Sequence, residues 1–151
     1  MEEEIVILLV EDDPHDVRLT LRELEREHLG NQIVVARDGA EALDFLFCRG
    51  AFSDRSSQHP PKLILLDLKL PKVNGLEVLR EIKSKPETRP IPVVVMTSSG
   101  EERDVVESYK LGVNSYIQKP VDFDKFRQTV KTLGLYWLVV NRLPPDKTFG
   151  S

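Results

Sequence analysis

The chain has 151 residues, of which 40% are hydrophobic and 30% charged, and its formal net charge is −4. These proportions are typical of a soluble globular domain, and a chain of this length can bury one substantial core. Acidic and basic residues are interleaved, so the composition offers no basic surface for nucleic acid. No apolar segment approaches the roughly 20 residues that span a bilayer. We therefore expect neither nucleic acid nor a membrane as a partner.

The amino-terminal residues and the cysteine content predict a cytoplasmic protein. Residues 1–10 begin with acidic side chains and lack the basic start and longer apolar core of a signal peptide. A single cysteine, Cys48, excludes an internal disulfide and fits a reducing compartment. We interpret Cys48 as a small residue packed near a helix end rather than as a reactive thiol.

Strand and helix signals alternate about five times along the chain, which is the pattern of parallel βαβ units. The predicted strands are the apolar runs 5–10, 32–36, 63–66, 93–96 and 115–118. The segments between most of them have apolar residues at helical spacing. We therefore predict an α/β fold with a five-stranded, parallel, doubly wound sheet.

Local signals refine this outline. Asp13-Pro14 has the form of a helix N-cap followed by proline at the first helical position. The polar segment 50–62 ends in two prolines and is predicted to be a surface loop longer than the usual connection. The helix before the fifth strand is predicted to carry Val105, Val106 and Tyr109 as its apolar side chains and to end at Gly112.

Charged and hydroxyl side chains follow the strands at the points where the strands end. Glu11, Asp12 and Asp13 follow the first strand, and Asp67 follows the third. Thr97 and Lys119 follow the fourth and the fifth. In open parallel sheets, ligand sites gather outside the carboxyl ends of the strands. The sequence therefore predicts a divalent-metal site beside a hydroxyl and an ammonium, an arrangement that is ready to receive a phosphoryl group.

Five motifs in this order make the chain resemble the receiver domains of two-component response regulators. They are Val-Glu-Asp-Asp at 10–13, Leu-Asp-Leu at 66–68, Leu-Pro-Lys-Val-Asn-Gly at 70–75, Met-Thr-Ser at 96–98 and Tyr-Ile-Gln-Lys-Pro at 116–120. Each motif alone is weak, but together they are highly specific. The resemblance covers residues 4–133 of the chain. It implies a flavodoxin-like (βα)5 receiver domain at 1–143 with an extended last helix, followed by a short tail at 144–151.

The resemblance also implies a chemistry for the sheet edge. Asp67 would accept a phosphoryl group from a sensor histidine kinase, as carboxylates do in other covalent mechanisms. Asp12 and Asp67 would bind Mg²⁺ directly, Glu11 would act through water, and the backbone carbonyl of Lys69 would supply a further ligand. Mg²⁺ suits such a site because it prefers oxygen ligands. Asp13 is better explained as the helix cap than as a ligand.

Three further roles follow from the resemblance. Thr97 and Lys119 would contact the phosphoryl oxygens, by a hydrogen bond and by a point charge respectively. Thr97 and Tyr116 would form a coupled switch that biases the last elements of the fold toward a partner-binding state. A cis bond before Pro120 would aim Lys119 inward. The protein would catalyse only its own phosphorylation and slow dephosphorylation.

Within the family, the chain looks most like the small single-domain regulators that accompany bacterial phytochrome kinases. That resemblance lies in Phe45-Leu46, Arg49-Gly50, the loop to Pro60-Pro61, Tyr136-Trp137-Leu138 and Leu143-Pro144. The extended last helix also predicts a homodimer. Residues 135–140 are all apolar, and a helix on its own sheet can bury only one stripe of them. Tyr136, Leu138 and Val139 would then form the dimer contact, unless the extra turn packs on the domain's own flank.

Other functions fit the sequence less well. A haloacid dehalogenase-type phosphatase needs a second aspartate two residues after its nucleophile, and that position is Lys69. A nucleotide- or flavin-binding module lacks support because neither the glycine-rich dinucleotide fingerprint nor the phosphate-loop lysine motif is present. Within the receiver family, the alternative is a phosphorelay intermediate that passes its phosphate to a histidine phosphotransfer protein. We expect His15, His28 and His59 to be solvated or capping residues.

Overall fold

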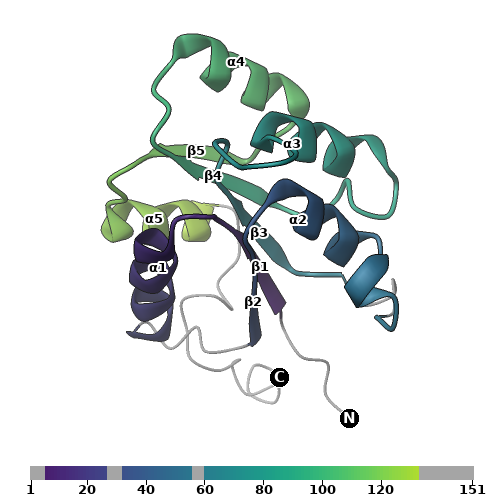
Figure 1. Cartoon of the computed structure of the whole chain (residues 1–151). Coiled ribbons are helices and arrows are strands. Elements are labelled where there is room, and N and C mark those ends of the chain that lie inside the picture. Colours follow the sequence, from purple (N-terminus) through teal and green to yellow (C-terminus); the bar gives the residue numbers. More distant parts are fainter. Residues whose placement is uncertain (1–5, 27–31, 56–59, 133–151) are drawn as a thin grey trace, which may run out of the picture.

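The computed structural model describes residues 6–26, 32–55 and 60–132. These residues form a parallel sheet of five strands in the order β2-β1-β3-β4-β5 (Figure 1). The strands are β1 (Val6–Val10), β2 (Gln32–Ala36), β3 (Leu63–Leu66), β4 (Val93–Thr97) and β5 (Ser115–Gln118). The helices are α1 (Pro14–Arg26), α2 (Gly39–Leu46), α3 (Gly75–Ser84), α4 (Glu102–Leu111) and α5 (Phe123–Thr132), and a short 3-10 helix, η1, spans Gly50–Phe52. The predicted α/β fold is confirmed.

The sheet is covered on both faces, as a doubly wound sheet must be. Helices α1 and α5 lie on one face, and α2, α3 and α4 lie on the other (Figure 1). Every residue of β3 and β4 is buried, which explains why these strands read as continuous apolar runs. In β1, Leu8 and Val10 pack into the core under α2 and α3, whereas Ile7 and Leu9 pack toward α1 and α5.

The first three helices each begin with a side-chain cap. The Asp13 carboxylate accepts a hydrogen bond from the backbone N–H of His15 at 2.9 Å, so its predicted role as the cap of α1 is confirmed. Asp38 caps α2 through the backbone N–H of Glu41, and Asn74 caps α3 through that of Glu77. Gly112 ends α4 with a φ of 104°, a left-handed conformation that favours glycine.

Helix α4 carries Val105, Val106 and Tyr109 and ends at Gly112, as predicted, but Val106 and Tyr109 do not face the core. Val106 is 44% exposed and Tyr109 is 50% exposed, whereas Ser108 is completely buried. The helix turns Ser108 toward the body of the domain, and Val105 and Leu111 lie partly buried. An inward face built on residues 104, 105, 108 and 111 follows helical spacing, but only two of these side chains are apolar.

Several expectations lie outside the described residues. The structure describes the last helix to Thr132, so the extension that carries Tyr136, Leu138 and Val139 stays a prediction. The same holds for the tail at 144–151 and for His28 and His59. His15 is exposed, as expected. Among the described helices, none is both long and apolar enough to cross a membrane.

Candidate functional site at the carboxyl edge of the sheet

Backbone hydrogen bonds hold the residues that follow β1, β3 and β5 in place. The N–H of Glu11 donates to the carbonyl of Ala36 at 2.9 Å, and the N–H of Asp67 donates to the carbonyl of Val10 at 3.0 Å. The N–H of Lys119 donates to the carbonyl of Thr97 at 2.8 Å. The ladder therefore continues one residue past the strands, and the functional side chains are carried by rigid backbone.

Three carboxylates meet at this edge. Glu11, Asp12 and Asp67 each have an oxygen within 4.8 Å of the others, in the geometry of a cation site. Glu11 is 4% exposed and Asp67 is 6% exposed, whereas Asp12 is exposed to solvent. Like charges at this separation repel one another unless a cation lies among them. An all-oxygen donor set of this kind fits a hard divalent ion such as Mg²⁺.

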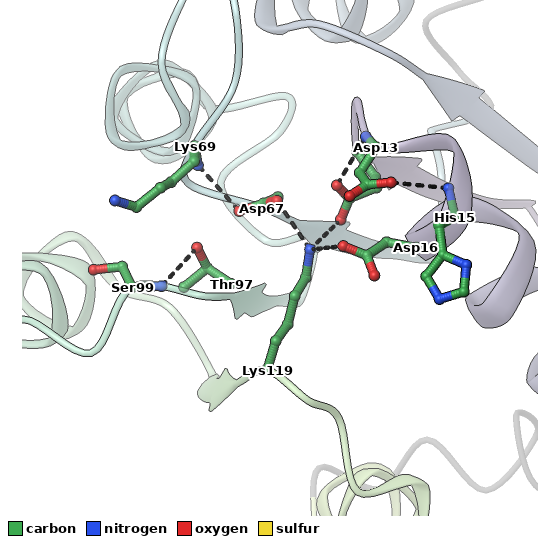
Figure 2. Close-up of polar contacts among 9 residues, drawn as sticks. Asp13, His15, Asp16, Asp67, Lys69, Thr97, Ser99 and Lys119 are labelled. Carbon is green, nitrogen blue, oxygen red and sulfur yellow. Dashed lines mark hydrogen bonds and ion pairs between the residues drawn. The ribbon is translucent and has the colours of Figure 1, made fainter.

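The Lys119 ammonium places a positive charge among the carboxylates of the site. Its ammonium donates to Glu11 Oε1 at 2.7 Å, to Asp16 Oδ2 at 2.8 Å and to Asp67 Oδ2 at 3.1 Å (Figure 2). The peptide bond between Lys119 and Pro120 is cis, as the family resemblance implies. Asp16 was not among the residues that the sequence singled out. It comes from the first turn of α1, and only the fold brings it to the lysine.

Burial and pairing shape the charges of this cluster. Burial raises the pKa of the Glu11 carboxyl to about 7. The hydrogen bond from Lys119 lowers this pKa, and the nearby negative charge of Asp67 raises it. Burial also opposes the charge on Lys119. The hydrogen bonds to Asp16 and Glu11 and the charge of Asp67 outweigh that cost and raise the Lys119 pKa above its ordinary value. Lys119 is therefore charged at every physiological pH.

The second oxygen of Asp67 is also held. Asp67 Oδ1 accepts a hydrogen bond from the backbone N–H of Lys69 at 3.0 Å (Figure 2). Gly75 lies against the backbone beside it, because a Cβ at Gly75 would come within 2.5 Å of the Asp67 carbonyl oxygen and 2.3 Å of Leu68 Cα. The segment 70–75 thus brings the start of α3 close behind the candidate phosphoacceptor. The Lys69 carbonyl remains a predicted metal ligand.

Ser99 connects Thr97 with Tyr116. Thr97 is completely buried, and its hydroxyl accepts a hydrogen bond from the backbone N–H of Ser99 at 3.4 Å. The Tyr116 hydroxyl donates to the Ser99 carbonyl at 2.9 Å, and the Ser99 hydroxyl donates to Asp104 on α4 at 2.5 Å. Burial raises the Tyr116 pKa, which keeps this hydroxyl a donor. Both predicted switch residues therefore contact a single serine that also contacts α4.

A cavity of about 180 Å³ opens beside Asp67 and Lys119. Asp16, Asp67 and Lys119 line it together with apolar residues, among them Leu65 and Met96 of the sheet and Phe123 of α5. The cavity therefore has both charged and apolar walls, and it is large enough for a small anion beside Asp67.

These observations define a receiver of two-component signalling. The chain belongs to this family, because the family model described as response regulator receiver domain matches residues 7–131. Among its relatives is the response regulator Rcp1 of Synechocystis, which is 42% identical over 139 residues that cover 92% of each chain. The probable methanogenesis regulatory protein FilR2 of Methanothrix harundinacea is 41% identical over 143 residues, which cover 95% of this chain and 90% of that protein.

Solved structures agree with this assignment. The bacteriophytochrome response regulator RtBRR is 54% identical, with a TM-score of 0.82 over 95% of this chain and 86% of that chain. The Mn²⁺-bound form of Rcp1 is 41% identical, with a TM-score of 0.76 over 93% of this chain and 99% of that chain. The predicted relationship to phytochrome-associated regulators is confirmed, and membership of the family implies a histidine kinase as a partner.

Proposed function

We propose that Asp67 accepts a phosphoryl group from a phosphohistidine of a sensor kinase. A carboxylate oxygen of Asp67 attacks the phosphorus, the phosphorus–nitrogen bond breaks, and the imidazole leaves with the electron pair of that bond. The product is an aspartyl phosphate. The observation that carries this proposal is the position of Asp67, which lies buried after a central strand and contacts Lys119 beside two further carboxylates.

Mg²⁺ is the cofactor that we propose for this site. Glu11, Asp12 and Asp67 would hold it, and the Lys69 carbonyl would complete the protein ligands by analogy with the family. A bound divalent ion would offset the negative charge on the phosphoryl group during transfer. The oxygen donors in this chain support the proposal, and so does the relative Rcp1, which has a structure described as Mn²⁺-bound.

Phosphorylation would then change the shape of the partner-binding face. Thr97 and Lys119 would contact the phosphoryl oxygens, and Tyr116 would respond to the movement of Thr97. The contacts at Ser99 support this coupling, because Thr97 and Tyr116 both hydrogen-bond to Ser99 while its hydroxyl bonds to Asp104 of α4. A movement of Thr97 would therefore be transmitted to α4 through Ser99.

The biological setting that we propose is a cytoplasmic phytochrome pathway. The similarity to RtBRR and Rcp1 supports a phytochrome-type histidine kinase as the phosphoryl donor. The protein would catalyse only its own phosphorylation and slow dephosphorylation, and it would act as a homodimer through Tyr136, Leu138 and Val139. The comparisons do not favour the alternative role as an intermediate that passes phosphate to a histidine phosphotransfer protein.

Incubation with acetyl phosphate and Mg²⁺ distinguishes the possible classes of function. A receiver should gain one phosphoryl group per chain, seen by mass spectrometry, and should release phosphate only slowly. Continuous release of phosphate over many turnovers would instead indicate a phosphatase. Absence of both labelling and turnover would contradict the proposed function.

A further inference from the structure

We propose that Asp16 is a positioning residue that holds the Lys119 ammonium and competes for it with the phosphoryl group on Asp67. The inference rests on the proposed function, because it assumes that Asp67 carries the phosphoryl group and that Lys119 contacts it. Asp16 belongs to the first turn of α1 and approaches Lys119 from the side opposite Asp67 (Figure 2).

The Lys119 ammonium has no N–H donor left over for a new contact. A lysine ammonium has three N–H donors. All three are used, at 2.7 Å to Glu11, 2.8 Å to Asp16 and 3.1 Å to Asp67. A new contact to a phosphoryl oxygen therefore requires Lys119 to release or share one carboxylate.

Exposure indicates which carboxylate Lys119 can release at least cost. The Asp16 side chain is 27% exposed, whereas those of Glu11 and Asp67 are 5% and 7% exposed. A buried carboxylate that loses its partner stays desolvated, which is costly, but a partly exposed one can be rehydrated. Asp16 also lies outside the cluster of Glu11, Asp12 and Asp67 that can hold a metal.

Removal of the Asp16 charge should affect the binding of an anion and of a cation in opposite directions. Asp16 partly neutralises Lys119, so its removal exposes more of the lysine's positive charge to both the metal and the phosphoryl position. An anion at Asp67 should then bind more tightly, and a divalent cation should bind more weakly. Lys119 keeps its contacts to Glu11 and Asp67, so it remains near the site. A residue that merely supported the local structure would weaken both ligands when substituted.

The test measures Mg²⁺ and beryllofluoride, a phosphoryl mimic, separately on Asp16→Asn. Isothermal titration gives the Mg²⁺ Kd, and amide chemical shifts at saturating Mg²⁺ give the beryllofluoride midpoint. We expect the beryllofluoride midpoint to fall and the Mg²⁺ Kd to rise, each by about three- to tenfold for one charge several ångströms away. Asp16→Ala should move both constants in the same two directions, and Asp16→Glu should restore the behaviour of the unmodified chain.

Glu25→Gln is the matched control, because it removes one negative charge from an exposed position on the same helix. It should leave both constants within about twofold, because charges more than a Debye length apart are largely screened. Unchanged constants in both Asp16→Asn and Asp16→Ala, or weaker binding of both ligands, would overturn the role of Asp16. If the unmodified protein bound beryllofluoride no better than Asp67→Asn does, the proposed function itself would fail, and this inference with it.

Discussion

At the scale of single residues, Glu11 links metal binding to pH. Burial raises its pKa to about 7, above the ordinary value of 4.5. Because the folded-state pKa is raised, the contribution of Glu11 to the stability of the metal-free protein is complete below about pH 4.5 and is lost as the pH rises through about 7. A metal ion needs the deprotonated carboxylate, so its binding must release this proton.

The predicted result is that Mg²⁺ binds up to about tenfold more tightly at pH 8 than at pH 6, with release of close to one proton at pH 6 and of little at pH 8. Titration calorimetry in buffers of different ionisation enthalpy measures both quantities. Glu11→Gln is the control, because it should bind Mg²⁺ more weakly and lose most of the pH dependence. Equal Mg²⁺ affinities at the two pH values would contradict this role of Glu11.

Lys119 and Thr97 are predicted to sense the phosphoryl group rather than to build the metal site. Lys119→Ala should bind Mg²⁺ at least as tightly as the unmodified chain, because it removes a positive charge beside the carboxylates. Its response to beryllofluoride should weaken by about 1.5–3 kcal/mol, and that of Thr97→Ala by about 0.5–1.5 kcal/mol. Amide chemical shifts read both responses, and a full conformational change in the two variants would contradict the assignment.

The contact between Asp16 and Lys119 could not be predicted from the sequence. The carboxyl ends of parallel strands meet at one edge, so the order of the motifs was enough to predict that Glu11, Asp67 and Lys119 lie together. Asp16 instead reaches the site from a helix, 103 residues before Lys119 in the chain. Its role depends on how α1 is rotated over the sheet and on how far the lysine extends, and neither is encoded in a local motif.

At the scale of elements, the start of α3 is tied to the backbone of the phosphoacceptor. Gly75→Ala would place a Cβ within 2.5 Å of the Asp67 carbonyl oxygen, so the backbone beside the site must move. We expect a loss of stability of about 1–3 kcal/mol, measured by urea unfolding, together with slower labelling by acetyl phosphate. In the matched variant Gly100→Ala, the new Cβ would meet only the amide end of the exposed Gln118 side chain, which can move aside. Equal stability in the two variants would contradict this packing account.

The strands were easier to predict than the helix faces. A strand buried on both faces leaves a continuous apolar run, and β3 and β4 have such runs. The apolar residues predicted on α4 do not mark its inner face. The structure buries Ser108 instead and leaves Tyr109 half exposed. A short helix at the edge of a domain can pack through small or polar side chains, so hydrophobicity alone did not identify its inner face.

At the scale of the whole molecule, the sequence after Thr132 predicts self-association. Tyr136→Glu with Val139→Glu should give a folded monomer that still accepts phosphate on Asp67, because the substitutions lie far from the site in sequence and would remove an apolar contact. Sedimentation velocity measures the oligomeric state, and circular dichroism checks folding. An unmodified chain that stays monomeric at high micromolar concentration, with and without beryllofluoride, would exclude the dimer.

The central claim is that Asp67 is the phosphoacceptor and that the reaction needs a divalent metal. The most direct measurement is labelling with acetyl phosphate and Mg²⁺, followed by borohydride reduction of the acyl phosphate and peptide mass spectrometry. The account predicts one modified residue, Asp67, and no labelling in Asp67→Asn or in excess EDTA. Labelling that survives in Asp67→Asn, that persists without metal, or that maps to another residue would contradict it.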